Sequence, residues 1–260
     1  MLIKVVAVQS RLGNKLSLEE KLFIFKQRPD FVCLPEYCLI GETTPDFSRA
    51  ALYSRENLQY MKNLSGEFTT CLIAGSMVEA EGDSLFNSAY LFNRGELMGR
   101  YRKLNPMAGE IEKGILPGDK LFTTIIDGVN IAILICADAL NSELFTLVGE
   151  MDLDIIFIPT TSPYRPGESK SDKYERDKNI YLKNAEISGA YIVKTCGVGQ
   201  LFNRPLQGRS LIASPWGIIQ RVDYHSESSA CILAAVLDIE EIREFRQKRN
   251  AHARKEKIVS

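Results

Sequence analysis

Three side chains with the chemistry of an acyl-transfer site each stand at the end of a short apolar run in this sequence. Glu36 could act as a base, Lys103 could stabilise a negatively charged oxygen, and the thiol of Cys136 could act as a nucleophile. Taken singly, they are more simply a solvated carboxylate, a solvated lysine and a small buried residue. Because α/β sheets bind ligands at the carboxyl ends of their strands, we expect all three to face one crevice.

Cys136 lies where an apolar run gives way to a helical pattern that begins at Asp138. A strand that runs straight into a helix leaves the residue between them on a tight turn, beside unpaired N–H groups. The positive end of the helix favours an anion at this place. We therefore expect the thiol of Cys136 to ionise more readily than that of an ordinary cysteine.

Apolar runs and turn signals predict that strands and helices alternate along the chain. The expected strands are 3–8, 31–34, 70–76, 88–93, 97–101, 121–126, 129–135, 154–159, 190–194 and 231–237. The expected helices, besides the one after Cys136, are 17–26, 54–64, 172–188 and a C-terminal helical tail over about 239–257. The three candidate residues therefore all lie just past the carboxyl ends of predicted strands.

The second half of the chain repeats the pattern of the first, unless these short matches arise by chance. Asp30–Pro35 matches Asp154–Pro159, and the strand that begins at Ser88 matches the one that begins at Ser210. Each half reads strand–helix–strand–helix–strand–hairpin, which places its helices on one face of a sheet. Two such halves bury their other faces by stacking. The sequence predicts an α/β fold, a four-layer α-β-β-α sandwich with an internal pseudo-two-fold repeat.

Composition and charge exclude several classes of protein. The 260 residues suffice for one large domain, and the net charge of −1 gives no basic field for nucleic acid. No apolar run reaches the roughly 20 residues that span a membrane, and no signal peptide precedes the first strand. The six cysteines include no C-x-x-C pair and are joined by only two histidines, so we expect free thiols, a cytoplasmic location and no metal.

Three motifs in this order and spacing resemble the nitrilase superfamily of carbon–nitrogen hydrolases. They are Leu34-Pro35-Glu36, Arg102-Lys103-Leu104 and Ile135-Cys136-x-Asp138, and the resemblance extends to Gly208-x-Ser210 with Pro215-x-Gly217. It covers almost the whole chain and implies the α-β-β-α sandwich as one domain over residues 1–260. It also implies a second glutamate after the lysine, for which Glu110 fits and Glu112 is the alternative.

The resemblance implies a mechanism that needs no cofactor or metal. Glu36 takes the thiol proton while the sulfur of Cys136 attacks an amide or nitrile carbon. Lys103 and the backbone N–H of Ala137 stabilise the negative charge of the tetrahedral intermediate. Ammonia or an amine leaves, water hydrolyses the thioester with Glu36 as the base, and Glu110 orients Lys103 or the substrate.

The sequence departs from the common pattern of relatives around the nucleophile. Ala137 stands where many relatives have a tyrosine, and Leu140 stands where they have an arginine. The loop after the strand 154–159 should border the crevice, so Tyr164 and Arg165 are candidate substrate contacts, with a solvated loop as the alternative. These differences leave the substrate open.

The sequence therefore leaves several functions open. The leading hypothesis is a hydrolase of small amides, with nitrile or N-carbamoyl amine substrates as alternatives. An acyltransferase and a catalytically silent binding or regulatory protein of the same fold are further ones. Apolar residues on two faces of the outer helices predict a homodimer or a larger homo-oligomer, with contributions from the C-terminal tail.

Overall fold

A seven-stranded sheet and a six-stranded sheet face one another in the computed structural model, which describes the backbone of residues 1–259 and the side chains of residues 1–251. The first sheet runs β15 (Cys231–Asp238), β1 (Leu2–Gln9), β2 (Phe31–Cys33), β3 (Cys71–Glu81), β4 (Ser84–Asn93) and β5 (Glu96–Arg102), with the short β6 (Ile115–Leu116) beside β4. The second runs β7 (Phe122–Ile126), β8 (Val129–Ile133), β9 (Ile155–Thr160), β10 (Tyr191–Cys196), β13 (Leu211–Ser214) and β14 (Gly217–Arg221).

The strand orders of the two sheets correspond, as the predicted repeat requires. In each sheet the three central parallel strands are followed by an antiparallel hairpin, and an antiparallel strand flanks the other side. The backbone N–H of Lys4 donates to Asp30 Oδ2 at 2.7 Å, and that of Asn130 donates to Asp154 Oδ2 at 2.9 Å. An aspartate at the matching position of each half thus ties the first strand of that half to its second strand.

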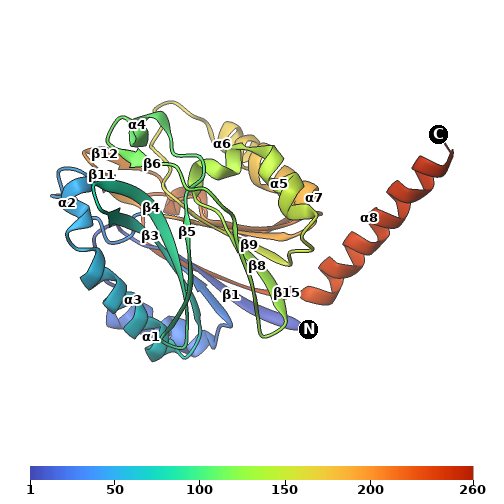
Figure 1. Ribbon diagram of the computed structural model, residues 1–260, viewed down its shortest axis with the longest axis horizontal. Helices are drawn as coiled ribbons and strands as arrows, with labels where there is room; N and C mark the ends of the chain where they lie inside the picture. The colour runs from blue at the N-terminus through green and yellow to red at the C-terminus, as the bar shows by residue number, and fades with distance from the viewer. Residues whose placement is uncertain (260) are drawn as a thin grey trace.

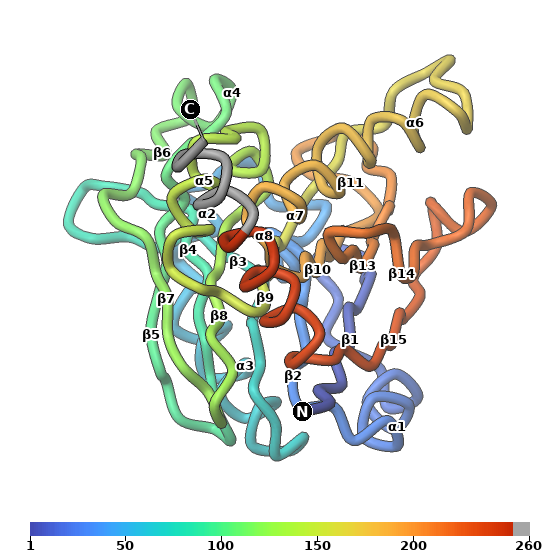
Figure 2. The backbone as a smooth tube through the Cα atoms, turned by 90° about the vertical axis from the view of Figure 1, so that its right-hand side faces the viewer, coloured from blue at the N-terminus to red at the C-terminus, as the bar shows by residue number. Residues whose placement is uncertain are grey.

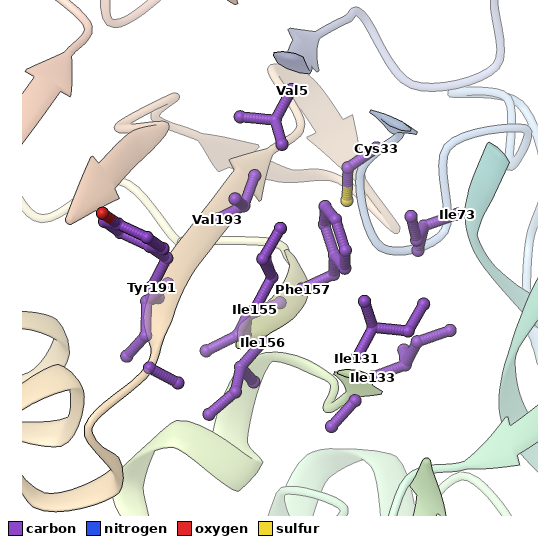
Figure 3. Close-up of a cluster of buried hydrophobic side chains, with 14 of the residues drawn as sticks. Val5, Cys33, Ile73, Ile131, Ile133, Ile155, Ile156, Phe157, Tyr191 and Val193 are labelled. Carbon is purple, nitrogen blue, oxygen red and sulfur yellow. The ribbon is translucent and has the colours of Figure 1, made fainter. Parts of the chain in front are cut away.

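Apolar side chains at alternate strand positions fill the space between the sheets (Figure 3). Val5 and Phe31 from the first sheet meet Phe157 and Val193 from the second. The rings of Phe31 and Phe157 lie 5.4 Å apart between centroids. This packing fixes the two sheets relative to one another, and with them the strand ends that carry the candidate residues.

Helices cover both outer faces, which confirms the four layers (Figure 1). The first sheet is covered by α1 (Leu18–Gln27) and α3 (Ser54–Phe68), whose Ile24 and Leu64 are buried against it. The second is covered by α5 (Ser142–Gly149) and α7 (Lys183–Ser188). The remaining helices and the small hairpin are α2 (Phe47–Ala51), α4 (Ala108–Ile111), α6 (Lys170–Asp177), β11 (Gly199–Leu201), β12 (Arg204–Leu206) and a turn at Tyr224–Ser226.

The edges of the sheets meet where β5 lies beside β7 (Figure 2). A side chain at Gly99 of β5 would lie 2.1 Å from the ring of Phe122 in β7, so only glycine leaves room for that ring. This contact closes one side of the sandwich next to the strand that leads into Lys103.

The helix predicted from Asp138 begins later than expected. Residues Cys136–Leu140 form a 3₁₀ turn, and α5 starts at Ser142, where the side chain of Asn141 accepts the N–H of Glu143 at 3.1 Å. The helix predicted over 172–188 is also not continuous, because a π-helical segment at Lys178–Leu182 separates α6 from α7.

The C-terminal helix α8 (Ile239–Val259) begins at the edge of the first sheet and leads away from the sandwich (Figure 1). The N–H of Ile239 donates to the carbonyl of Met1 at 2.9 Å. Arg243 and Arg246 pair with Asp154 at 2.6 and 2.7 Å. Within the described part of the chain, no helix combines the length and the apolar character needed to cross a membrane.

Candidate active site

Two of the strand ends at the site have strained backbones. Cys136 has a φ of 46° and Tyr37, directly after Glu36, has a φ of 53°, both in the left-handed region that ordinary residues seldom adopt. The turn at Cys136 is held by Asp138, which accepts the N–H of Ile135 at 2.8 Å and the hydroxyl of Tyr101 at 2.8 Å. Such strain is typical of residues whose side chains must point into a site.

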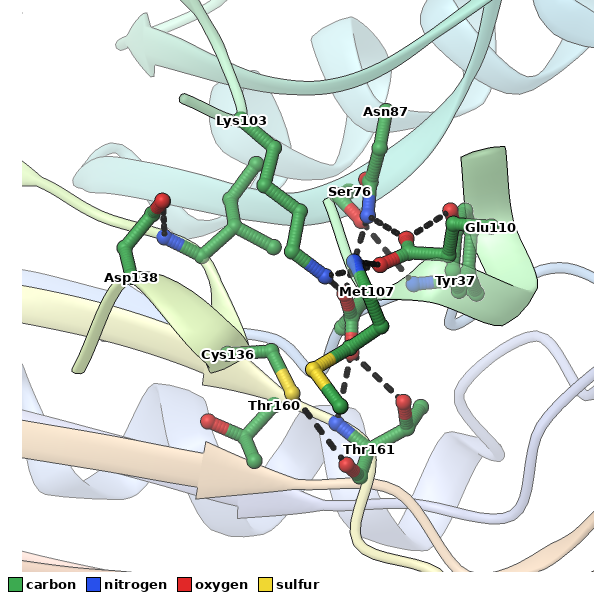
Figure 4. A network of polar contacts seen from close by, with 12 residues as sticks. Tyr37, Ser76, Asn87, Lys103, Met107, Glu110, Cys136, Asp138, Thr160 and Thr161 are labelled. Carbon is green, nitrogen blue, oxygen red and sulfur yellow. Dashed lines mark hydrogen bonds and ion pairs between the residues drawn. The ribbon is translucent and has the colours of Figure 1, made fainter. Parts of the chain in front are cut away.

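Lys103 lies between two carboxylates (Figure 4). Its Nζ is 2.8 Å from Glu36 Oε1 and 2.6 Å from Glu110 Oε2. Glu36 and Lys103 are each only 1% exposed, and Glu110 is also buried. Glu112 is exposed, so Glu110 is the carboxylate beside Lys103.

Further donors fix Glu110 in this position. Its Oε1 accepts the hydroxyl of Tyr37 at 2.6 Å and the amide of Asn87 at 3.0 Å, and its Oε2 accepts the N–H of Met107 at 2.8 Å. Asn87 also donates to Glu36 Oε1 at 2.8 Å. One amide group therefore joins both carboxylates and holds them on either side of Lys103.

Thr161, which directly follows β9, contacts both the carboxylate of Glu36 and the thiol. Its N–H and hydroxyl donate to Glu36 Oε2 at 2.8 and 2.5 Å. Its carbonyl accepts the thiol of Cys136, with 3.3 Å between sulfur and oxygen (Figure 4). Thr161, at the end of a strand of the second sheet, thus positions the Glu36 carboxylate beside the Cys136 sulfur.

The charges of the network stabilise one another. Burial opposes the charge of Lys103, but the carboxylates of Glu36 and Glu110 outweigh it and raise the pKa of the ammonium. Burial likewise opposes ionisation of Glu110, but Lys103 lowers the pKa of this carboxyl below its usual value. The lysine is therefore a permanent cation at this end of the cavity.

The expectation that Cys136 ionises readily is wrong. Burial, followed by the negative charge of Glu36, raises the pKa of the thiol well above its ordinary value, and Lys103 opposes this only in part. The residue stands at a short 3₁₀ turn and not at the N-terminus of a full helix, and such a turn has too few aligned peptide groups to compensate. The resting thiol is therefore protonated.

These side chains open into a cavity of about 330 Å³. Glu36, Lys103, Glu110 and Cys136 all line it, so the structure brings together the candidate residues that the sequence placed at one crevice. Ala137 and Arg165 also line it. Apolar side chains form much of the remaining wall, among them Phe47, Met107, Leu140, Tyr181, Phe202 and Leu206.

Tyr164 lies outside the cavity lining. Its side chain is 51% exposed and it is absent from the cavity lining, whereas its neighbour Arg165 belongs to it. The N–H of Tyr164 donates to the carbonyl of Pro205 at 2.9 Å, in a bridge to the hairpin β11–β12. This bridge gives the loop a strand-like alternation, so adjacent residues point to opposite sides.

Sequence reasoning missed Tyr37, Asn87 and Thr161. Two of them had a detectable signal, because Asn87 directly precedes Ser88, where the repeat was recognised, and Thr161 follows the strand that matches the Glu36 strand. Nothing in the sequence marks Tyr37 apart from its place after Glu36. Among the described residues, no group of three or more His, Cys, Asp or Glu side chains is arranged to hold a metal ion.

Comparison with known proteins places this geometry in a family. The sequence model for carbon–nitrogen hydrolases matches residues 8–247. The chain is 25% identical over 240 residues to the omega-amidase of Mus musculus, covering 86% of this chain and 82% of that protein. It is 22% identical over 212 residues to the deaminated glutathione amidase of Synechocystis, covering 75% of each.

The fold has close counterparts among solved structures. A carbon–nitrogen hydrolase from Helicobacter pylori G27 superposes with a TM-score of 0.81 at 19% identity, covering 95% of this chain and 93% of that one. The family match extends over nearly the whole sandwich and includes every strand end that faces the cavity. The chain therefore belongs to the carbon–nitrogen hydrolase family, whose chemistry is the hydrolysis of carbon–nitrogen bonds other than peptide bonds.

Proposed function

We propose that the protein hydrolyses the carbon–nitrogen bond of a small amide through a thioester on Cys136. The observation that carries this proposal is the Lys103 ammonium, paired with two buried carboxylates at 2.8 and 2.6 Å and lining the same cavity as the thiol. A binding protein has no need of a nucleophile, a base and a buried cation in one cavity. The similarity to two amidases favours amides over nitriles.

The first half-reaction forms the thioester and releases the amine. Because the resting thiol is protonated, Glu36 must accept its proton as the sulfur attacks the carbonyl carbon. The carbonyl oxygen becomes an oxyanion, which the ammonium of Lys103 and the N–H of Ala137 stabilise. The carbon–nitrogen bond then breaks, and Glu36 returns the proton to the leaving nitrogen.

The second half-reaction regenerates the enzyme. Glu36 takes a proton from a water molecule, whose oxygen attacks the thioester carbon. The carbon–sulfur bond breaks, a carboxylic acid leaves and the sulfur recovers its proton. Glu110 takes no proton in this scheme, because its role is to hold Lys103 through the contact at 2.6 Å.

Assembly and location complete the proposal. Leu140 is 62% exposed and Leu147 of α5 is also exposed, which supports burial of this face in a homodimer. All six cysteines are free, which supports a reducing, cytoplasmic environment. Light scattering at micromolar concentration tests the dimer, and an active monomer would contradict it.

The decisive experiment measures ammonia release across small amides, N-carbamoyl amines and nitriles, together with intact-protein mass. With an amide substrate we expect turnover and, after rapid acid quenching, an added acyl mass on Cys136. Cys136→Ala should lose both signals, whereas the matched control Cys231→Ala, at a half-buried thiol far along the chain, should keep both. Turnover in the Cys136→Ala variant would refute the thioester.

A further inference from the structure

Helix α1 carries an apolar stripe that faces away from the sandwich. Leu18, Leu22 and Phe25 are 72%, 48% and 58% exposed. Because they are spaced four and three residues apart, they share one face of the helix. A single exposed apolar residue is ordinary on a protein surface, whereas a continuous apolar stripe marks a place where another molecule binds.

The fold itself does not use this face of the helix. α1 is held to the first sheet by Ile24, which is fully buried, and to α3 by Lys21, whose Nζ lies 2.7 Å from Glu67 Oε2. Ser17 and Glu20 close its N-terminus through two reciprocal hydrogen bonds. Helix α8 leaves the sandwich on the side away from α1 (Figure 1). The stripe is therefore open to a partner.

The stripe is also separate from the cavity that holds Cys136. No residue of α1 lines that cavity, and α1 lies on the outer face of the first sheet. Binding of a small substrate therefore does not explain the stripe, and a macromolecular partner has to cover it.

Charged residues flank the stripe in a pattern that fits a second copy of the same helix. Glu19 and Lys26 are both exposed and, being seven residues apart, lie on the same flank. When two helices pair antiparallel about a two-fold axis, equal flanks meet, so Glu19 of one copy lies opposite Lys26 of the other. In a parallel pair unequal flanks meet, and Lys21 would approach Lys26, which is repulsive. The charges thus favour antiparallel self-pairing.

The same charges disfavour a lipid surface. Helices that lie on anionic membranes carry an excess of Lys and Arg on their polar face. Within its ten residues α1 has two glutamates and two lysines, so it has no such excess. Equal numbers of both signs on a helix complement a second copy of that helix.

We propose that α1 is an interface between two copies of this chain, in which the two stripes pack antiparallel and two Glu19–Lys26 ion pairs flank them. Such a contact is isologous and closes after two copies. Two ten-residue helices bury less surface than a standard stable interface, so the association should be reversible at micromolar concentrations. Leu140 and Leu147 lie on the opposite outer layer, so α1 can join two α5-paired dimers into a tetramer.

Sedimentation velocity across micromolar concentrations tests this contact, because it measures mass and does not depend on turnover. The mass of wild type should double as the concentration rises. Leu22→Gln and Phe25→Gln each remove an apolar side chain from both sides of the contact and should raise the Kd by about 100-fold. A mass that neither rises with concentration nor falls in Leu22→Gln would overturn the proposal.

Phe23 provides the matched control. It is 44% exposed, similar to the residues of the stripe, but it lies on another side of the helix. Phe23→Gln should therefore leave the Kd within about threefold of wild type. Equal increases in Phe23→Gln and Phe25→Gln would mean non-specific adhesion and would overturn the proposal.

Exchange of the flanking charges tests the orientation of the helices. Glu19→Lys and Lys26→Glu should each raise the Kd by about tenfold, because each turns both ion pairs into repulsions. An equimolar mixture of the two variants should associate as wild type does, because every pair then joins opposite charges again. A mixture that does not associate, or tighter association of Lys26→Glu alone, would overturn antiparallel pairing.

Two further measurements exclude other causes. The substituted side chains are exposed, so urea denaturation should find each variant as stable as wild type. The mixing experiment stays decisive where one variant folds poorly, because a misfolded chain is not rescued by another. Vesicles of phosphatidylcholine should bind no protein. Vesicle binding by wild type that Leu22→Gln abolishes, without a change of mass in solution, would overturn the proposal in favour of a lipid surface.

Discussion

The two halves of the molecule share one strand order but end their strands differently. In the first half, β2 leads to Glu36, and the N–H of Lys103 donates to the carbonyl of Asn87 at 2.9 Å. In the second half, β9 leads to Thr161, and the N–H of Val222 donates to the carbonyl of Ser210 in the same way, at 2.9 Å. The repeated backbone therefore supports charged side chains in one half and neutral ones in the other.

At the ends of the first strands, the reactive residue lies in the second half and the neutral, buried residue lies in the first. Cys136 follows β8 and lines the cavity, whereas Gln9 at the end of β1 is fully buried. The Gln9 amide donates to Ser229 O at 3.0 Å and its oxygen accepts the N–H of Ser210 at 3.2 Å. A side chain at Gly208 would lie 2.2 Å from Gln9, which explains the glycine of the Gly208-x-Ser210 motif.

The difference between the halves teaches how a duplicated scaffold makes one site instead of two. Asn87, whose carbonyl accepts the N–H of Lys103, binds two carboxylates, whereas Ser210, whose carbonyl accepts the N–H of Val222, binds the neutral amide of Gln9. One half supplies the buried charge network. The other supplies the thiol and Thr161, the residue that positions it.

The largest expected effect contrasts Cys136 with Gln9. Cys136→Ala should lower ammonia release by at least about 10⁴-fold and leave the free energy of unfolding nearly unchanged. Gln9→Ala should do the opposite, because it leaves buried groups around Ser210 without partners and should cost about 2–3 kcal/mol. Steady-state kinetics and urea denaturation check both, and a fully stable Gln9→Ala protein would contradict the structural role.

The charge network of the first half should be nearly as sensitive. Glu36→Gln keeps the shape of the side chain but removes the base, and Lys103→Ala removes the stabilising cation. Each should lower kcat by roughly 10²–10³-fold. Activity within about threefold of wild type in either variant would show that the residue has another role.

The pH dependence of alkylation tests the same network independently of turnover. Glu36→Gln removes the proton acceptor, so labelling of Cys136 then depends on free thiolate, whose fraction rises about tenfold per pH unit below the pKa of the thiol. Iodoacetamide should label this variant with the same slope, and wild type with a shallower one because Glu36 accepts the proton. Equal slopes would remove Glu36 as the base.

The other thiols provide the internal control. Burial raises the pKa of Cys33, Cys38 and Cys71 to about 12, and none of them lines the cavity. Cys136 lines the cavity together with Glu36, which can accept its proton, so peptide mapping after brief alkylation at neutral pH should find the label on Cys136. Early labelling of Cys38 would mean that the region around Glu36 opens in solution.

The sequence was sufficient for the sandwich and for the gathering of Glu36, Lys103, Glu110 and Cys136. Strand periodicity and the repeat depend on local patterns, and strand ends share one edge of a sheet. The direction in which the pKa of Cys136 shifts could not be predicted in this way, because it depends on burial and on charged residues far apart in the chain. The same holds for the separation of Tyr164 from Arg165, which depends on a bridge to Pro205.

A smaller effect, on the free energy of unfolding, should distinguish the matched aspartates Asp30 and Asp154. Asp154 is buried with Arg243 and Arg246, whereas Asp30 is exposed. Asp154→Asn should cost about 3 kcal/mol, and Asp30→Asn about 1 kcal/mol or less. Burial opposes ionisation of Asp154, but the arginines hold its pKa below the usual value. Its contribution is therefore present above the ordinary carboxyl range and is lost as the pH falls below it, where urea denaturation should find wild type and Asp154→Asn alike.

The smallest expected effect concerns Thr161, whose hydroxyl and N–H hold the carboxylate of Glu36 beside the thiol. Thr161→Val keeps the shape and the backbone donor but removes the hydroxyl bond of 2.5 Å, so Glu36 is less firmly placed. A lost hydrogen bond to a charged group predicts a decrease in kcat of about tenfold, and Thr161→Ser should restore most of it.

A positioning role predicts more than a slower enzyme. Thr161→Val should lower kcat while KM stays within about threefold, because the lost bond holds the base Glu36. Thr160→Val, at the neighbouring buried residue whose hydroxyl bonds to the carbonyl of Ile158, is the matched control and should leave both constants in place. An unchanged kcat in Thr161→Val, or an equal decrease in both variants, would mean that the second half contributes only packing to the placement of Glu36.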